Sequence, residues 1–91
     1  MRKEDRVRLP PPLQLELPPG FMVKTRPGGY SVYLRYRIGV GWGEDLVCAV
    51  DLGEVPRMKE WIEGQVKAVV KKLASPEGWR GIHLIQPAKG V

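Results

Sequence analysis

Two neighbouring stretches of the chain alternate apolar and polar side chains with a period of two residues. They cover residues 21–26 and 30–38 and are separated by Pro27, Gly28 and Gly29. A period of two is typical of a strand with one buried face. Pro27 presets the φ of the first central position of a type II turn, and Gly28 tolerates the positive φ of the second. The chain is therefore predicted to fold around an antiparallel β-hairpin, and other residues must cover one face of that hairpin.

A third strand is expected after a glycine-rich segment, residues 39–43, which we interpret as a flexible loop. The strand is predicted over residues 45–52. There the alternation directs Leu46, Cys48 and Val50 toward the core.

A single helix is predicted over about residues 56–74. Pro56 suits the first helical turn, where its missing N–H is harmless, and the Ser75-Pro76 pair ends the pattern. After it, residues 82–86 predict a short last strand. Apolar residues recur along the helix at spacings of three and four, which gives one apolar stripe. The stripe consists of Met58, Trp61, Ile62, Val66, Val69, Val70 and Leu73.

These elements predict an α+β fold in the order β-β-β-α-β. A small antiparallel sheet of about four strands packs on one amphipathic helix, and its other face stays open. A chain of 91 residues has room for one such core. Five of the nine prolines lie within residues 1–20, so this segment is predicted to be an extended Pro/Leu-rich arm, and residues 21–91 a single domain.

The net charge of +5 is unevenly distributed, because the whole excess of basic residues lies in the first 40 positions. Alternation places four of these cations on the open face of the predicted hairpin, beside Met22, Ser31 and Tyr33. In single-stranded nucleic-acid binding, cations follow the phosphates while aromatic rings stack on the bases. The four cations are Lys24, Arg26, Arg35 and Arg37.

The open face is therefore predicted to bind nucleic acid, although an ordinary solvated sheet face is the competing interpretation. Trp42, and Trp79 with Arg80, are expected to extend the site from the edges of the sheet. For both tryptophans, covering the core is an equally open alternative. The candidate nucleic-acid-binding residues are Met22, Lys24, Arg26, Tyr33, Arg35, Arg37, Trp42, Trp79 and Arg80.

Other classes of function find little support in the sequence. His83 is the one histidine and has no partner for catalysis nearby in sequence, and Cys48 is expected to be a buried, inert thiol. We therefore expect no enzyme activity, catalytic residue, metal site or cofactor. The chain has no apolar stretch long enough to span a bilayer and no secretory signal, which predicts a cytoplasmic protein without membrane contact. The absence of Asn, with few Gln and many Pro, resembles thermophile composition.

The basic and aromatic segments MVKTR and YSVYLRYR, a tryptophan-bearing loop and one long helix together resemble a known family. It is the ThermoDBP-type family of single-stranded-DNA-binding proteins from hyperthermophilic archaea. The resemblance rests on element order and residue character over roughly residues 13–86. It implies a DNA-binding cleft formed by the sheet, and it favours DNA over RNA. The contacts it implies are Lys24, Arg26, Tyr33, Arg35, Arg37 and Trp42.

Two alternatives remain open at this point. The arrangement also resembles the arm-type DNA-binding domains of tyrosine integrases, which insert a three-stranded sheet into the major groove of duplex DNA. A protein-interaction or assembly module that uses the Pro/Leu-rich arm is the alternative from another class. A homodimer through the arm or a sheet edge is compatible with each of these interpretations.

Overall fold

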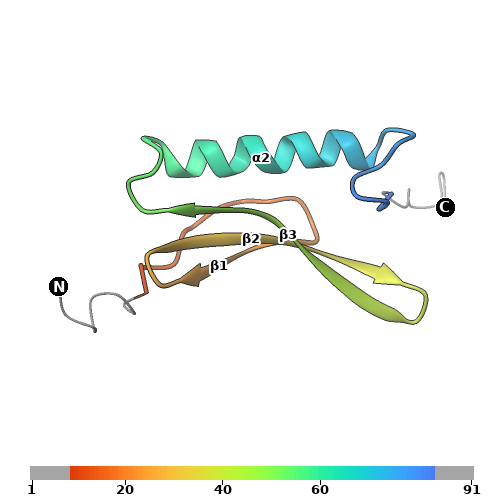
Figure 1. Ribbon diagram of the computed structural model, residues 1–91, viewed down its shortest axis with the longest axis horizontal. Coiled ribbons are helices and arrows are strands. Elements are labelled where there is room, and N and C mark those ends of the chain that lie inside the picture. The colour runs from red at the N-terminus through yellow and green to blue at the C-terminus, as the bar shows by residue number, and fades with distance from the viewer. Residues whose placement is uncertain (1–8, 84–91) are drawn as a thin grey trace.

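The computed structural model describes residues 9–83. Within them, three antiparallel strands form one sheet in the order β1-β2-β3, and a single helix packs on one face (Figure 1). The elements are β1 (Phe21–Arg26), β2 (Gly29–Ile38), β3 (Gly41–Asp51) and α2 (Met58–Leu73). The predicted α+β class and the order of these four elements are confirmed.

The first hairpin agrees with the prediction. Arg26 pairs with Gly29 across the turn, and Gly28 has a φ of +81°, as the second central position of a type II turn requires. Tyr30 and Val32 of β2 face the helix and are almost fully buried. The alternation of the sequence therefore correctly assigned the buried face of this strand.

The glycine-rich segment, residues 39–43, is not the flexible loop that the sequence predicts. Ile38 pairs directly with Gly41, so the turn contains two residues, and Gly39 takes a φ of +56° at its first position. Gly43 lies within β3, where the Tyr36 ring covers it. A Cβ at Gly43 would lie 2.7 Å from ring atoms of Tyr36. The glycine thus serves close packing inside a strand, which explains why a strand can contain it.

Strand β3 contains a bulge that the sequence analysis did not foresee. Val32 pairs with Cys48 but Tyr33 pairs with Leu46, which leaves Val47 as the extra residue. From Leu46 toward the second turn, each residue of β3 therefore faces the side opposite to the one that uninterrupted alternation predicts. The prediction that Leu46 faces the core is therefore wrong: its side chain is 43% exposed, and Val47 packs against the core instead.

The core lies between the sheet and α2. Four helical residues at the predicted spacing are buried, and Trp61 packs at the margin of the same core, as expected. The N-terminal segment, residues 9–19, has no helix or strand and lies on the same side of the sheet as α2 (Figure 1). Leu13, Leu15 and Leu17 pack against the core, and the Tyr30 hydroxyl donates a hydrogen bond to the carbonyl of Pro11 at 2.7 Å. This segment therefore fills part of the layer that the single helix leaves uncovered.

The chain after α2 turns back toward the sheet. Ser75 ends the helix by donating from its hydroxyl to the carbonyl of Lys72. Trp79 and Ile82 form an isolated antiparallel bridge. The predicted last strand over residues 82–86 has most of its length outside the described residues, and Ile82 belongs to no strand of the sheet.

Candidate nucleic-acid interface

Strand pairing places the predicted site residues of β1 and β2 side by side on the open face. Met22 lies opposite Tyr33, and Lys24 lies opposite Ser31. Strand β3 brings the predicted site residue Trp42 onto this face and adds Glu44 and Leu46, which were not predicted there. The cross-strand partners are Leu46 for Tyr33, Glu44 for Arg35 and Trp42 for Arg37.

The open face carries less free positive charge than the sequence indicated. Lys24 Nζ lies 3.2 Å from Glu44 Oε1, and Arg26 forms an ion pair with Asp51. Both acids come from β3, far from the cations in sequence. Exposed ion pairs of this kind add little stability, but they partly neutralise the cations that they contact. Lys24 also lies over the Tyr33 ring, 4.6 Å from its centroid.

Of the four cations on the open face, Arg35 and Arg37 have no acidic partner within residues 9–83. Both guanidinium groups lie over the Trp42 indole, with distances of 6.0 Å and 5.2 Å to the ring centroid. Trp42 is 64% exposed, so part of its ring surface stays accessible to a ligand. The three side chains form a cluster that we call the Arg–Trp cluster (Arg35, Arg37, Trp42).

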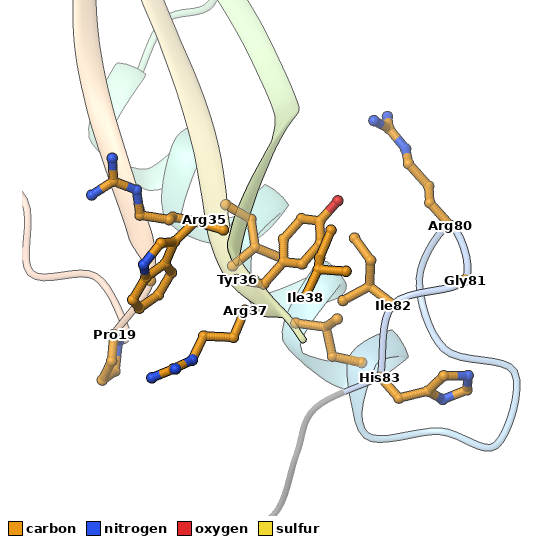
Figure 2. Close-up of a pocket in the computed structure, with 13 residues that line it drawn as sticks. Pro19, Arg35, Tyr36, Arg37, Ile38, Arg80, Gly81, Ile82 and His83 are labelled. Atoms are coloured by element: carbon orange, nitrogen blue, oxygen red, sulfur yellow. The ribbon is translucent and has the colours of Figure 1, made fainter. Parts of the chain in front are cut away.

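A groove of about 800 Å³ adjoins the Arg–Trp cluster (Figure 2). It lies at the end of β2 and β3, where these strands extend beyond β1 (Figure 1). Arg35 and Arg37 point to one side of β2, whereas Tyr36 and Ile38 point to the other side, toward Ile82 (Figure 2). The groove is lined by Pro19, Gly20, Leu34, Arg35, Tyr36, Arg37, Ile38, Trp42, Leu73, Arg80, Gly81, Ile82 and His83.

Of the two alternatives for Trp79, the structure places it in the core. The side chain is 9% exposed and packs with Leu34, Val69 and Leu73. Arg80 covers it, with its guanidinium carbon 4.3 Å from the ring centroid, and donates from Nη1 to the carbonyl of Leu46 at 2.8 Å. Trp79 is therefore not presented for base stacking, and Arg80 ties the C-terminal loop to β3 while lining the groove.

Two titratable groups of the sheet have raised pKa values. Partial burial raises the pKa of the Tyr36 phenol, and the Asp45 carboxylate, which accepts its hydrogen bond at 3.3 Å, raises it further. Burial also raises the pKa of the Cys48 thiol, which lowers its thiolate fraction at neutral pH. Both shifts keep the neutral forms in place, and neither group is poised to act as a base or nucleophile.

Several groove residues were missed because they belong to the helix-facing side of the sheet. Alternation places Tyr36 and Ile38 on the helix-facing side of β2. Tyr36 is partly buried there against a cluster that includes Leu73 of α2, whereas Ile38 is exposed, and both line the groove. Pro19 was assigned to the arm. One signal was available in the sequence: the first predicted strand is three residues shorter than the second, so the second must extend past it.

Comparisons with protein-family models, curated proteins and solved structures gave no significant match to this chain. Within residues 9–83, no cluster of His, Cys, Asp and Glu has the arrangement needed to hold a metal ion. The same part of the chain contains no helix with the length and apolar character required to cross a bilayer.

The interface combines guanidinium groups, an exposed indole and a groove. Guanidinium groups donate hydrogen bonds to phosphate oxygens in a fixed planar geometry. An exposed indole presents a large apolar face to any flat ring. The adjoining groove has apolar side chains on one side and cations at its rim. Together these groups suit a ligand that combines negative charge with flat, apolar rings.

Proposed function

We propose that this protein binds single-stranded nucleic acid, without catalysis and largely independently of sequence. The observation that carries the proposal is the Arg–Trp cluster at the rim of a groove, in which two arginines lie over an exposed tryptophan and have no acidic partner within residues 9–83. Phosphates bind the guanidinium groups, and a base stacks on the indole. Stacking of this kind tolerates every base, because each has a flat π face.

The proposed site is smaller than the one predicted from the sequence. Arg35, Arg37, Trp42 and the groove form its centre. Lys24, Arg26, Tyr33 and Met22 form a neighbouring surface whose two cations are already paired with Glu44 and Asp51. Because those carboxylates repel phosphate, we expect the second surface to contribute less. The ligand is expected to be DNA on the family resemblance described above, with a cytoplasmic location.

Fluorescence anisotropy with labelled oligo-dT, compared with a duplex of equal length and with oligo-rU, tests the proposal. Oligo-dT is expected to bind more tightly than the duplex. Tighter duplex binding would favour the integrase-like mode instead, and absence of binding to all three probes at low salt would refute nucleic-acid binding. Weaker binding of oligo-rU would support the preference for DNA.

A matched pair of double variants separates the site from general charge attraction. Arg35→Ala with Arg37→Ala removes two cations from the cluster. Lys59→Ala with Lys71→Ala removes two exposed cations from α2, on the other side of the sheet. Both variants change the net charge equally. We expect the arginine variant to lose most of its oligo-dT affinity and the lysine variant to lose little.

A further inference from the structure

Strand β2 extends beyond the strand that covers one of its edges. The last pair between β1 and β2 is Phe21 with Leu34, and the amide of Arg35 donates one further hydrogen bond to the carbonyl of Gly20 at 2.8 Å. From Tyr36 to Ile38, β2 is paired on the β3 side only, as far as residues 9–83 are concerned. This edge of β2 borders the groove, between Gly20 and the second turn.

The backbone groups that face the groove can be identified from the ladder. In an antiparallel pair, successive residues direct their N–H and C=O groups alternately to the two sides of the strand. The Arg35 N–H points to the β1 side, so the N–H and C=O of Arg37 point the same way, past the end of β1. The Arg35 carbonyl shares this direction, and Gly20 lies beside it. A carbonyl and an amide two residues apart thus form an acceptor and a donor next to each other.

An unpaired base presents the complementary pattern. The Watson–Crick edge of every base has a hydrogen-bond donor adjacent to an acceptor, for example N3–H and O4 of thymine. In a duplex these groups already pair with the opposite strand. We propose that the free edge of β2, through the backbone of Arg35 and Arg37, hydrogen-bonds the Watson–Crick edge of an unpaired base held in the groove. This inference rests on the proposed function and assigns the means by which the site distinguishes single strands from duplex.

The side chains that flank the edge suit a flat ring in that position. Trp42 lies opposite Arg37 on the open face. Ile38 belongs to the other face and points toward Ile82 (Figure 2). A planar group paired to the strand edge lies between these two sets of side chains. The guanidinium groups of Arg35 and Arg37 are then next to the backbone of the same nucleotide. Since the protein groups involved are backbone atoms and any base has a matching pair, sequence tolerance is retained.

Oligo-dT and an oligonucleotide built entirely from N3-methylthymidine provide the direct test. The methyl group removes the N3–H donor but keeps the phosphates and the stacking face. With the full chain, we expect the methylated strand to bind roughly 3- to 10-fold more weakly, as expected for the loss of one net hydrogen bond. Equal affinity of the two strands would overturn the inference while leaving nucleic-acid binding intact. If neither strand binds, the proposed function fails as well.

The backbone donor is tested by comparing Arg37→Pro with Arg37→Ala. Both variants lack the guanidinium, but only proline also lacks the N–H that faces the groove and is not used in the β2–β3 ladder. We expect Arg37→Pro to bind oligo-dT roughly 3- to 10-fold more weakly than Arg37→Ala. If both variants fold and bind oligo-dT with equal affinity, the Arg37 N–H does not take part in binding.

Hydrogen exchange of the Arg37 amide in the unmodified chain gives an answer even if the proline variant does not fold. The amide is expected to exchange rapidly in the free protein and slowly with oligo-dT bound. An unchanged exchange rate at saturating oligo-dT would show that the edge is not used.

Discussion

The three tryptophans differ in how far they are exposed, and their expected roles differ accordingly. Trp42 is 64% exposed beside two arginines, Trp61 packs at the margin of the core, and Trp79 is 9% exposed inside it. A ring that is already buried contributes to stability, whereas an exposed ring is available for stacking. The number of aromatic residues in a sequence therefore says less about binding than their individual exposure.

The first prediction follows from this difference. Replacing Trp42→Leu should weaken oligo-dT binding by roughly 5- to 150-fold, since stacking contributes about 1–3 kcal/mol per base. The midpoint of thermal unfolding should hardly change. Trp79→Leu is the control and should lower that midpoint clearly, because it removes a buried ring. Unchanged oligo-dT affinity in Trp42→Leu would exclude the indole from the site.

The second prediction compares two glycines. A Cβ at Gly43 would lie 2.7 Å from the Tyr36 ring, whereas a Cβ at Gly64 on the exposed side of α2 meets nothing within 4 Å. Gly43→Ala should reduce the free energy of unfolding by about 1–3 kcal/mol through overpacking. Gly64→Ala should increase it by about 0.5–1 kcal/mol, because alanine favours the helix. Denaturant unfolding measures both, and a neutral Gly43→Ala would mean that the ring moves aside freely.

The third prediction concerns pH. The pKa of Tyr36 is raised above its ordinary value of 10.0 by burial and by Asp45. A group whose pKa is higher in the folded state stabilises the fold fully below its unfolded pKa and loses that contribution as the pH rises through the folded value. Stability should therefore fall above pH 10, and Tyr36→Phe should remove part of that fall. Thermal unfolding of both proteins between pH 8 and 11 checks this, and parallel pH profiles would contradict it.

At the level of whole elements, the hairpin and the helix were predictable and the third strand was only partly so. Periods of two and of three to four residues reveal which face of an element is buried. A bulge adds one residue without changing the composition, so the exchange of faces at Val47 leaves no simple trace in the pattern. Likewise, the sequence around Gly41 and Gly43 is typical of a loop. The reason that Gly43 lies in a strand, its close contact with the Tyr36 ring, is visible only in the structure.

The candidate site, like the fold, was predictable where it depends on the first hairpin and not where it depends on β3. Alternation correctly placed Lys24, Arg26, Arg35 and Arg37 on one face, because all four lie in the first hairpin. Their acidic partners were not predictable, since a loop of uncertain length leaves the register of β3 undefined. The two-residue turn at Gly39-Val40 determines that register. It brings Glu44 opposite Arg35 and Trp42 opposite Arg37.

The fourth prediction tests the bulge. Leu46 is on the open face and Val47 packs against the core, which is the reverse of the predicted pattern. Leu46→Ala should change the free energy of unfolding by less than about 1 kcal/mol, whereas Val47→Ala should cost about 1–2 kcal/mol although it removes fewer atoms. A larger cost for Leu46→Ala would indicate that β3 continues without the bulge.

At the scale of the whole molecule, one helix and the N-terminal segment share the task of covering one side of the sheet. Beyond β1, the end of β2 and β3 extends past the helix-covered part of the sheet (Figure 1). Within residues 9–83, this end and the groove beside it remain uncovered. Three leucines of the arm, Leu13, Leu15 and Leu17, pack on the core, so fewer of the arm's apolar groups are available to bind a partner. The open end of the sheet is therefore the more accessible surface for a ligand.

The last prediction uses the salt dependence of binding to count the cations that engage phosphate. For single strands, the logarithm of the affinity falls with the logarithm of the salt concentration by roughly 0.7 per neutralised phosphate. If Arg35 and Arg37 act while Lys24 and Arg26 stay paired with Glu44 and Asp51, the slope should be about −1.4; engagement of all four would give about −2.8. Replacing Glu44→Gln and Asp51→Asn keeps the shape of both side chains and releases both cations, so the slope should steepen toward the larger value. A slope near −2.8 in the unmodified protein, unaffected by these changes, would mean that the ion pairs open on binding and that the whole open face acts as one site.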